Sequence, residues 1–310
     1  MRDEPAVELE KVVKRFASRS AVDRVDLRVP QGSIFGFIGP NGSGKTTTMR
    51  LILRIYRPDE GRVVVLGSEQ GNASDSRVGY LPEERGLYRR MTVRRVLRYF
   101  AQLKGIRRPD RLIDQHLERL GAQEWSGKRV NQLSKGMAQK IQFIVAVIAN
   151  PDLVILDEPF SGLDPVNLDL MREVVKELNA VGTTVIFSTH DMEVAQRLCD
   201  RVFMIYQGKK VLDGTIDAIR DDYGVCAVRV RMDGGQTVPE GLPGVTSMRK
   251  TGSFMELQLE SKDSRGRLLS TLSGLGDVAH FETVQPTLHD IFVRIANPSE
   301  ESSELEKVQA

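Results

Sequence analysis

The sequence of 310 residues predicts an α/β fold: a domain with a mainly parallel sheet, a helical insertion within it, and a small α+β domain near the C-terminus. Three observations favour this fold. Short, almost continuous apolar runs alternate with helical patterns, which is typical of parallel strands buried on both faces. A polar helical stretch without such a run interrupts the series. After residue 214 the pattern changes to half-buried strands and amphipathic helices.

The first strands lie within the first forty residues. Val25, Leu27 and Val29 alternate with charged neighbours, which predicts a half-buried strand, and the same alternation precedes it. The tighter run Ile34–Ile38 predicts a strand with both faces buried. Later runs that we interpret in the same way are Val63–Leu66, Leu153–Leu156 and Thr184–Phe187.

The remaining chain sets the domain boundaries. The polar helical pattern from about Arg85 to Arg129 predicts a helical subdomain at about 85–150, within a domain of residues 1–220. Strand-like alternation and two amphipathic helices predict a separate α+β domain over 222–296. Thr287 and Asp290 have the spacing of a helix-capping pair. The glutamate-rich residues 297–310 show no packing pattern and are expected to be disordered.

Composition excludes several classes of protein. A net charge of +2 is too small for the strong basic excess that is usual in nucleic-acid-binding proteins. Two cysteines, Cys199 and Cys226, are too few for a disulfide framework or a zinc site. The N-terminus has no apolar segment of signal-peptide length, and the apolar stretch Ile141–Ala149 is too short to cross a bilayer. We therefore expect a cytoplasmic chain.

A glycine-rich loop follows the strand at Ile34–Ile38. Residues 39–46 read GPNGSGKT and fit the pattern G-x-x-x-x-G-K-[ST], in which backbone N–H groups surround phosphate oxygens. The lysine is expected to contact the β- and γ-phosphates, and the threonine hydroxyl to bind Mg²⁺. The following helix adds the positive end of its dipole. The predicted nucleotide-binding residues are Gly39, Pro40, Asn41, Gly42, Ser43, Gly44, Lys45, Thr46 and Thr47.

Two carboxylates follow the apolar strand Leu153–Leu156. In a fold with a phosphate loop, a carboxylate at the C-terminal end of such a strand lies beside the metal, so Asp157 is predicted to bind Mg²⁺. Glu158 is then placed to orient the attacking water as a general base. An isolated Asp-Glu pair would more often be a solvated turn, but the strand and the loop favour the metal site.

These motifs together resemble those of the ATP-binding subunits of ABC transporters, in order over about residues 6–215. Phe16 is similar to the aromatic residue on which adenine stacks, although a core position is the alternative. Leu133–Met137 resembles the family's signature, in which Ser134 and Gly136 face the nucleotide of the opposite subunit. The segment Ser161–Asp164 resembles the D-loop, and His190 resembles the histidine that contacts the γ-phosphate.

The sequence departs from the family pattern in two places. Glu83 stands where a glutamine is usual, so it could coordinate Mg²⁺ as a carboxylate, but it cannot donate a hydrogen bond. In the signature, Lys135 replaces a glycine and Met137 a glutamine, and Lys135 requires an ordinary, negative φ. These departures and the closing PTLHDIFV at 286–293 resemble sodium-exporter-like ATPases with a small C-terminal domain.

The resemblance implies a function. We expect an ATP-hydrolysing subunit that binds ATP and Mg²⁺, with Lys45, Glu158 and His190 as catalytic residues. It would pair with a second copy or a homologous ATPase and drive separately encoded transmembrane permease subunits as an exporter, from the inner face of the cell membrane. The alternative is a soluble ATPase of the same type that acts on a nucleic-acid or ribosomal target, although no nucleic-acid partner is expected. A nucleotide-binding regulator without activity would usually lack the base.

One charged segment allows two main interpretations, with nucleic-acid binding as a weaker third because few aromatic residues accompany the charges. Residues 85–111 contain ten basic residues and one acidic residue, Asp110. The surface could face anionic lipid headgroups or a transmembrane partner. It could equally be a solvated helical surface.

Overall fold

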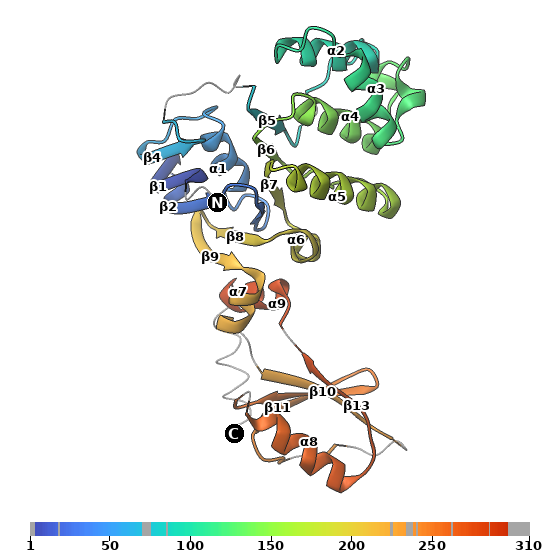
Figure 1. The fold of residues 1–310 in the computed structure, drawn as a ribbon. Helices are drawn as coiled ribbons and strands as arrows, with labels where there is room; N and C mark the ends of the chain where they lie inside the picture. The colour runs from blue at the N-terminus through green and yellow to red at the C-terminus, as the bar shows by residue number, and fades with distance from the viewer. Residues whose placement is uncertain are drawn as a thin grey trace. The chain divides into compact units, whose positions relative to one another are not determined.

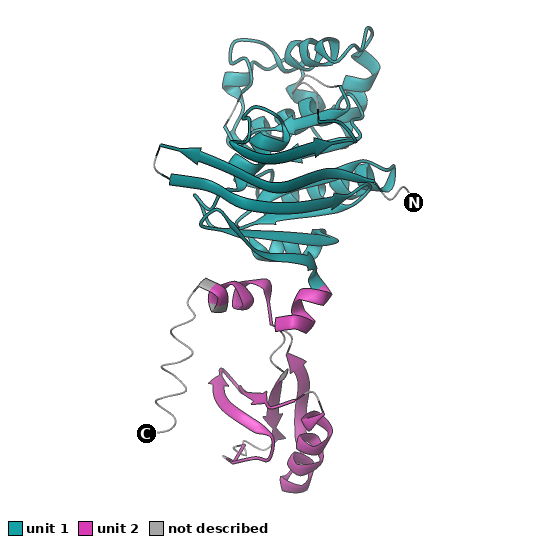
Figure 2. Cartoon of the chain, turned by 90° about the vertical axis from the view of Figure 1, so that its left-hand side faces the viewer, with its two compact units in different colours: residues 1–216 teal, residues 217–310 magenta. Residues whose placement is uncertain are grey.

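The computed structural model describes residues 4–17, 19–69, 76–84, 86–223, 226–233, 238–239, 241–261, 263–284 and 286–296. The chain divides into two compact units, residues 1–216 and 217–310 (Figure 2). The division falls at the start of helix α7 (Ile216–Tyr223), a few residues before the boundary of 220–222 expected from the sequence. The predicted disordered tail, 297–310, lies outside the described residues.

The central layer of unit 1 is a mainly parallel sheet. In the described residues its strand order is β5-β6-β7-β3-β8-β9, and β9 alone among these six runs antiparallel to its neighbour (Figure 1). The strands are β3 (Ile34–Ile38), β5 (Val78–Leu81), β6 (Leu153–Leu156), β7 (Thr184–Thr189), β8 (Arg201–Tyr206) and β9 (Lys209–Thr215). The predicted mainly parallel sheet is confirmed.

The apolar runs are buried on both faces, as predicted. In β6, Leu153 and Ile155 pack on one side of the sheet, against α1 (Lys45–Ile52) and the N-terminal strands. Val154 and Leu156 pack on the other side of the sheet, in a core that they share with helices. Because neither face meets water, the strand has no polar alternation. The phosphate loop and both carboxylates therefore lie at the C-terminal ends of buried strands.

A second, antiparallel sheet covers one side of this layer. Its order is β2-β1-β4, from β1 (Pro5–Phe16), β2 (Arg19–Pro30) and β4 (Glu60–Val65). Our interpretation of Val63–Leu66 as a strand of the parallel sheet is wrong. Val63 and Val65 are buried in the antiparallel sheet, whereas Val64 is half-buried, so β4 alternates. Three successive valines conceal that alternation in the sequence.

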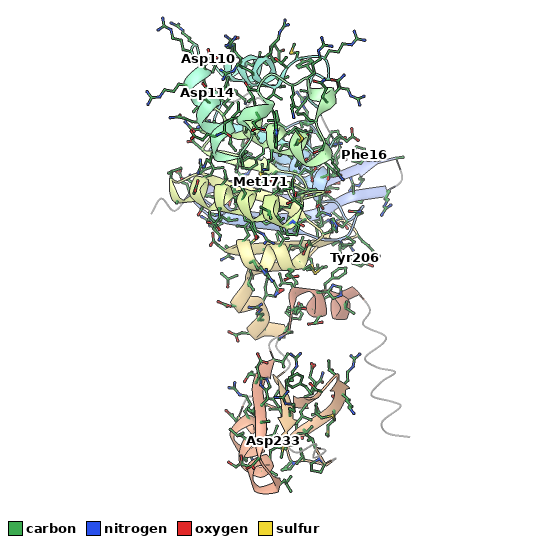
Figure 3. All side chains as sticks on the ribbon, turned by 90° about the vertical axis from the view of Figure 1, so that its right-hand side faces the viewer. Phe16, Asp110, Asp114, Met171, Tyr206 and Asp233 are labelled. Atoms are coloured by element: carbon green, nitrogen blue, oxygen red, sulfur yellow. The ribbon has the colours of Figure 1, made fainter. Side chains whose placement is uncertain are left out.

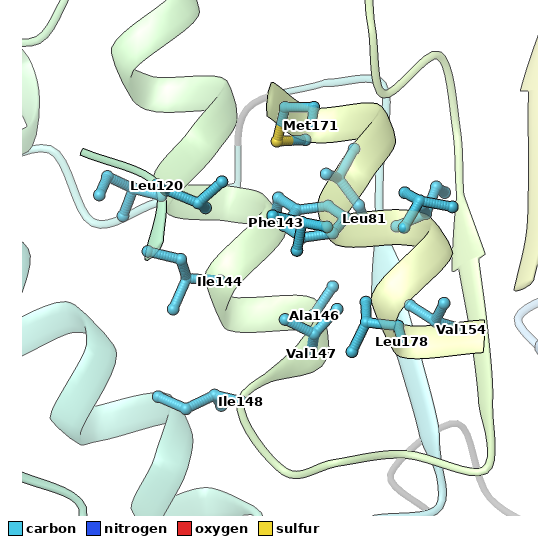
Figure 4. Packing of buried hydrophobic residues seen from close by; sticks show 14 of the residues in the cluster. Leu81, Leu120, Phe143, Ile144, Ala146, Val147, Ile148, Val154, Met171 and Leu178 are labelled. Carbon is cyan, nitrogen blue, oxygen red and sulfur yellow. The ribbon is translucent and has the colours of Figure 1, made fainter. Parts of the chain in front are cut away.

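Helices cover the opposite side of the parallel sheet. They are α4 (Lys135–Val147), α5 (Pro165–Ala180) and α6 (Met192–Leu198). Figure 4 shows side chains of α4, among them Phe143 and Ala146, beside Leu81 of β5 and Val154 of β6. At Gly79 of β5 a Cβ atom would lie 2.1 Å from the carbonyl oxygen of Ala146, so α4 approaches this strand closely only because residue 79 is glycine.

The helical insertion is present. It contains α2 (Val93–Leu103), α3 (Asp110–Arg119), the 3₁₀ helices η1 (Gln123–Trp125) and η2 (Val130–Gln132), and α4. The inward residues of α2, such as Val96 and Leu97, join the core that α4 shares with the parallel sheet. The helical insertion is thereby fixed to the parallel sheet of unit 1 through α4.

Unit 2 contains a small antiparallel sheet and helices. Its strand order is β11-β12-β10-β13, from β10 (Cys226–Met232), β11 (Val245–Thr251), β12 (Phe254–Leu259) and β13 (Val278–Val284). Helix α8 (Ser264–Leu275) buries Leu268 and Leu272 against the inner face. At α9 (Leu288–Ala296), Thr287 and Asp290 exchange backbone-to-side-chain hydrogen bonds of 2.9 and 3.1 Å, as a capping pair. The predicted α+β character is confirmed.

Within the described ranges, no helix has both the length and the apolar character needed to span a bilayer.

Candidate active site

The phosphate loop joins β3 to α1 and can be formed only with glycine at two positions. Gly39 has φ 153°, and a Cβ atom there would lie 2.3 Å from the carbonyl oxygen of Ile205. Gly44 has φ 116°, and its Cβ atom would lie 2.5 Å from the carbonyl oxygen of Ala21. Any side chain would collide with the backbone of β8 or β2. The loop therefore curls tightly against both strands.

Lys45 is buried at the start of α1, with 5% of its surface exposed. Its Nζ donates hydrogen bonds to the carbonyl oxygens of Gly39 at 2.7 Å and Pro40 at 3.2 Å. Burial lowers the pKa of Lys45, and the carboxylates of Glu158, Asp157 and Glu83 act in the opposite direction. A cation is thus held within the loop, where it can face a phosphate group.

One carboxylate oxygen of Asp157 accepts hydrogen bonds, and the other has no partner among the described residues. Its Oδ1 accepts hydrogen bonds from the hydroxyls of Ser188 at 2.5 Å and Thr46 at 3.3 Å. Its Oδ2 is buried and has no hydrogen-bond partner among the described residues. A buried carboxylate oxygen without a partner is costly, and a cation would satisfy it. The pair Thr46 and Asp157 has the oxygen chemistry that Mg²⁺ prefers.

Glu158 lies in a strained turn directly after Asp157. Its φ is 49°, in the left-handed region that residues with a Cβ rarely adopt. The backbone N–H donates to the Ser188 hydroxyl at 2.9 Å, and Oε1 lies 2.9 Å from Nδ1 of His190. His190 follows β7, so the neighbouring strands β6 and β7 bring these two side chains together. The carboxylate of Glu158 is mostly buried, whereas His190 is largely exposed.

The loop and the carboxylates line one cavity of about 540 Å³. Predicted site residues that line it are Phe16, Asn41, Gly42, Gly44, Lys45, Thr46, Thr47, Glu83, Asp157 and Glu158. Gly39 and Pro40 do not line the cavity, but their carbonyl oxygens accept hydrogen bonds from Lys45. The Ser43 hydroxyl is buried without a partner among the described residues, and His190 contacts the site through Glu158.

Phe16 lies at the rim of the cavity. It is 44% exposed, which excludes the core position that the sequence left open. The ring makes an edge-to-face contact with Tyr56, with centroids 5.3 Å apart, and the ammonium of Lys14 lies 5.7 Å from its centroid. Figure 3 shows Phe16 at the edge of unit 1. An exposed ring face at the rim can stack on a planar base.

Glu83 lies in the loop after β5 and is exposed on the cavity side. The neighbouring carbonyl of Glu84 accepts a hydrogen bond of 3.4 Å from Gln142 of α4. The side chain of Glu83 therefore shares the cavity with the phosphate loop, while the backbone of its loop is attached to α4.

Ser134 and Gly136 do not line this cavity. Ser134 caps α4, and its hydroxyl accepts a hydrogen bond of 3.2 Å from the N–H of Met137. Gly136 lies against the D-loop-like segment, where a Cβ atom would be 3.4 Å from the carbonyl oxygen of Gly162. Lys135 is helical, with an ordinary φ, and is exposed beside Ser134. The N-terminus of α4 thus presents polar groups away from the chain's own phosphate loop.

Sequence reasoning missed several residues of the site. Ser188 and Gln139 hold the backbone of the turn at Glu158 and Pro159, but neither belongs to a motif that the sequence analysis used. Polar residues in buried strand or helix positions are the signal that could have identified them. The cavity is also lined by Arg19, Ser20, Ala21, Gln207 and Gly208. The last two form the β8–β9 turn, and the N–H of Gly208 donates to the carbonyl of Ser43 at 2.9 Å.

Models of two protein families match the chain. A model of the ABC transporter family matches residues 22–161, and a model described as ATP-binding protein DrrA1-3-like, C-terminal domain, matches residues 214–296. The chain is 39% identical over 287 residues to the ABC transporter ATP-binding protein YhaQ of Bacillus subtilis, covering 92% of this chain and 96% of YhaQ.

Two further matches are a second relative and a solved structure. The Nod factor export ATP-binding protein I of Sinorhizobium fredii is 33% identical over 299 residues, which cover 95% of this chain and 87% of that protein. A solved structure of the ATP-binding subunit of an ABC transporter has a TM-score of 0.66 and 29% identity, over 71% of this chain and 93% of that one. The chain therefore belongs to the ABC transporter ATP-binding proteins, which are ATPases that bind ATP.

Proposed function

We propose that this chain hydrolyses ATP in composite sites, each formed by the cavity of one copy and the α4 N-terminus of another. One observation carries the proposal: Ser134 and Gly136 lie outside the cavity that the phosphate loop lines, while Ser134 and Lys135 are exposed. A helix N-terminus attracts phosphate through its N–H groups and its dipole. The cation of Lys135 adds to that attraction. The exposed end of α4 is therefore suited to the triphosphate held by a second subunit, which can be another copy or a homologous ATPase.

Within one copy the nucleotide would extend from the rim to the loop. Adenine would stack on Phe16, and the phosphates would meet the loop N–H groups and Lys45. Mg²⁺ would be held by Thr46 and Asp157, with Glu83 as a further ligand. Held by these residues, the ion would supply charge stabilisation at the γ-phosphate.

Glu158 is proposed as the general base. Its carboxylate would accept a proton from the attacking water as the oxygen of that water bonds to the γ-phosphorus and the bond to ADP breaks. His190 would hold the carboxylate in position through the 2.9 Å contact and, being exposed, could also reach the γ-phosphate. Lys45 would neutralise charge that develops on the phosphate oxygens.

The composite site can be tested by mixing two inactive variants. Ser134→Arg blocks contact across the interface but leaves the phosphate loop intact, and Lys45→Ala removes the loop cation but leaves α4 intact. Each variant alone should lose hydrolysis, whereas a mixed dimer contains one complete site. Recovery of activity on mixing supports composite sites. Normal hydrolysis by Ser134→Arg alone would show that the signature does not contribute.

We propose that the membrane partner is a separately encoded permease and that the complex works as an exporter. This chain would then lie at the inner face of the cell membrane. The similarity to a Nod factor export protein and to a DrrA1-3-like C-terminal domain supports this. Co-purification from native membranes tests it: a protein with several membrane spans should accompany the chain. Recovery with ribosomes or nucleic acid would instead support the alternative target.

The basic surface of the helical insertion is suited to such docking. Arg94 and Arg98 form ion pairs with Asp110, at 3.2 and 2.5 Å. Arg95, Arg107 and Arg108 are exposed and make no ion pair within the described residues. Figure 3 shows side chains with nitrogen tips extending outward around Asp110 and Asp114. Unpaired arginines are attracted by anionic headgroups or acidic segments of a permease.

The contribution of this surface to docking can be measured directly. Combined Arg95→Glu and Arg108→Glu substitutions should lower the fraction of the chain found on native membranes, and should leave ATP binding unchanged. An unchanged membrane fraction would identify a solvated surface.

A further inference from the structure

Helix α4 carries three buried polar side chains that point to different parts of unit 1. Gln139, Lys140 and Gln142 are 6%, 4% and 3% exposed, within an otherwise apolar stretch of the helix. Buried amides and ammonium groups are costly unless they are hydrogen-bonded. Each of these three donates to a backbone carbonyl outside α4. Their positions are therefore set by contacts with other segments and not by solvent.

Gln139 contacts the turn at Glu158 and Pro159, which we call the catalytic turn because Glu158 is the proposed base. Its Nε2 donates to the carbonyl oxygens of Glu158 at 3.3 Å and Pro159 at 3.1 Å. On the other side of the same turn, the hydroxyl of Ser188 accepts the N–H of Glu158. The turn with φ 49° is thus held from α4 on one side and from β7 on the other. A strained conformation persists only when its surroundings over-determine it.

The other two side chains anchor α4 elsewhere. Lys140 donates to the carbonyl of Leu120 at 3.0 Å and lies 5.6 Å from the ring centroid of Trp125, in the helical insertion. Gln142 donates to the carbonyl of Glu84 at 3.4 Å, in the loop after β5. A single helix therefore contacts the catalytic turn, the helical insertion and the Glu83 loop through three polar residues within four positions.

We infer that Gln139 is a positioning residue that sets the catalytic turn of its own chain according to the position of α4. The inference rests on the proposed function, in which the nucleotide of a second subunit engages α4 at Ser134. Gln139 is five residues further along the same helix, a rise of about 7.5 Å. A shift of α4 relative to the parallel sheet would move both donated hydrogen bonds, and Glu158 would leave its alignment with His190. Nucleotide binding at one site would then change the position of Glu158 in the other site through α4.

The test compares isosteric substitutions at two glutamines of this helix. Gln139→Met removes the donor to the catalytic turn, and Gln142→Met removes the donor to Glu84 at a matched, equally buried position. Gln139→Met should lower kcat about tenfold and leave KM and the affinity for ATP, measured in EDTA, within about twofold. Gln142→Met should keep kcat within about twofold of the wild type. Thermal unfolding of both variants checks that loss of packing is equal.

A donor-restoring variant separates positioning from packing. In Gln139→Lys an ammonium can reach the same two carbonyls, as Lys140 does at Leu120, and kcat should recover at least threefold relative to Gln139→Met. Equal loss of kcat in Gln139→Met and Gln142→Met, or no recovery with lysine, would overturn the inference and indicate a general loosening of α4. Absence of hydrolysis by the wild type would instead refute the proposed function, and the inference with it.

Discussion

The Ser188 hydroxyl lies between Asp157 and Glu158 and bonds to both: it donates to Oδ1 of Asp157 at 2.5 Å and accepts the N–H of Glu158 at 2.9 Å. Because Oδ1 is engaged in this way, Oδ2 of Asp157 is the oxygen left for a metal. The same hydroxyl fixes the backbone from which the proposed base projects. Ser188 of β7 thus sets the relative position of the proposed metal ligand and the proposed base, which both follow the neighbouring strand β6.

Removal of this hydroxyl should impair catalysis more than folding. A hydrogen bond to a charged group contributes about 1.5–3 kcal/mol, so Ser188→Ala should lower kcat by about 10- to 100-fold and require more Mg²⁺ for half-maximal activity. ATPase activity over a Mg²⁺ titration measures both effects. Ser33→Ala is the matched control, because the Ser33 hydroxyl is also buried but donates to the carbonyl of Pro30 away from the cavity. A Ser188→Ala variant with the Mg²⁺ dependence of the wild type would remove Ser188 from the site.

Glu83 is predicted to act in coupling more than in the chemical step. Its side chain shares the cavity with Lys45, and Gln142 attaches its loop to α4. Glu83→Gln retains an oxygen ligand and should keep activity within about tenfold, or roughly 1.4 kcal/mol. Glu83→Ala should weaken stimulation by the membrane partner more than basal hydrolysis. Basal and partner-stimulated rates across a Mg²⁺ titration test this, and equal stimulation of Glu83→Ala and wild type would exclude a coupling role.

Because His116 is buried, we expect the free energy of unfolding to decrease in acid. Burial lowers its pKa from 6.5 to about 4, with a smaller contribution from Arg119. Because the folded state disfavours the protonated ring, the unfolded chain binds more protons between these values, and stability is lost as the pH falls through 6.5 toward 4. Linkage gives about 1 kcal/mol lost between pH 7 and pH 5.5.

His116→Gln should remove this part of the pH dependence. Urea unfolding of both proteins at the two pH values measures it, and carboxylates that titrate in both proteins cancel in the comparison. An equal loss of stability in wild type and variant would show that His116 is not buried as a neutral ring.

Much of the fold and of the loop was predictable because the signals are contiguous. The run Ile34–Ile38 followed by GPNGSGKT carries its own context in successive residues. β5 was missed because four residues with a central glycine, VGYL, resemble a turn as much as a strand. Its place beside β6 depends on Gly79 fitting under α4, which is a property of packing and not of local pattern.

The site was predictable only where a motif names its residues. Gln139 reads as an ordinary polar position of an amphipathic helix, and its burial depends on the carbonyls of Glu158 and Pro159, twenty residues later. Ser188 lies near the end of the apolar strand β7, where the sequence cannot show that Asp157 lies beside it. Both contacts follow from strand and helix placement across the sheet. The roles of Glu158, His190 and Ser134 remain predictions that experiments on the protein must test.

The central claim is that Glu158 activates water in a dimer closed by ATP. Glu158→Gln retains the phosphate loop and Asp157, so ATP and Mg²⁺ should still bind, while hydrolysis should fall by at least about 100-fold. The measurement is ATP turnover together with molecular mass by light scattering, with and without Mg²⁺ and ATP. We expect negligible turnover and a dimer that accumulates only with ATP. Near-normal turnover, or a variant that stays monomeric with ATP, would contradict it.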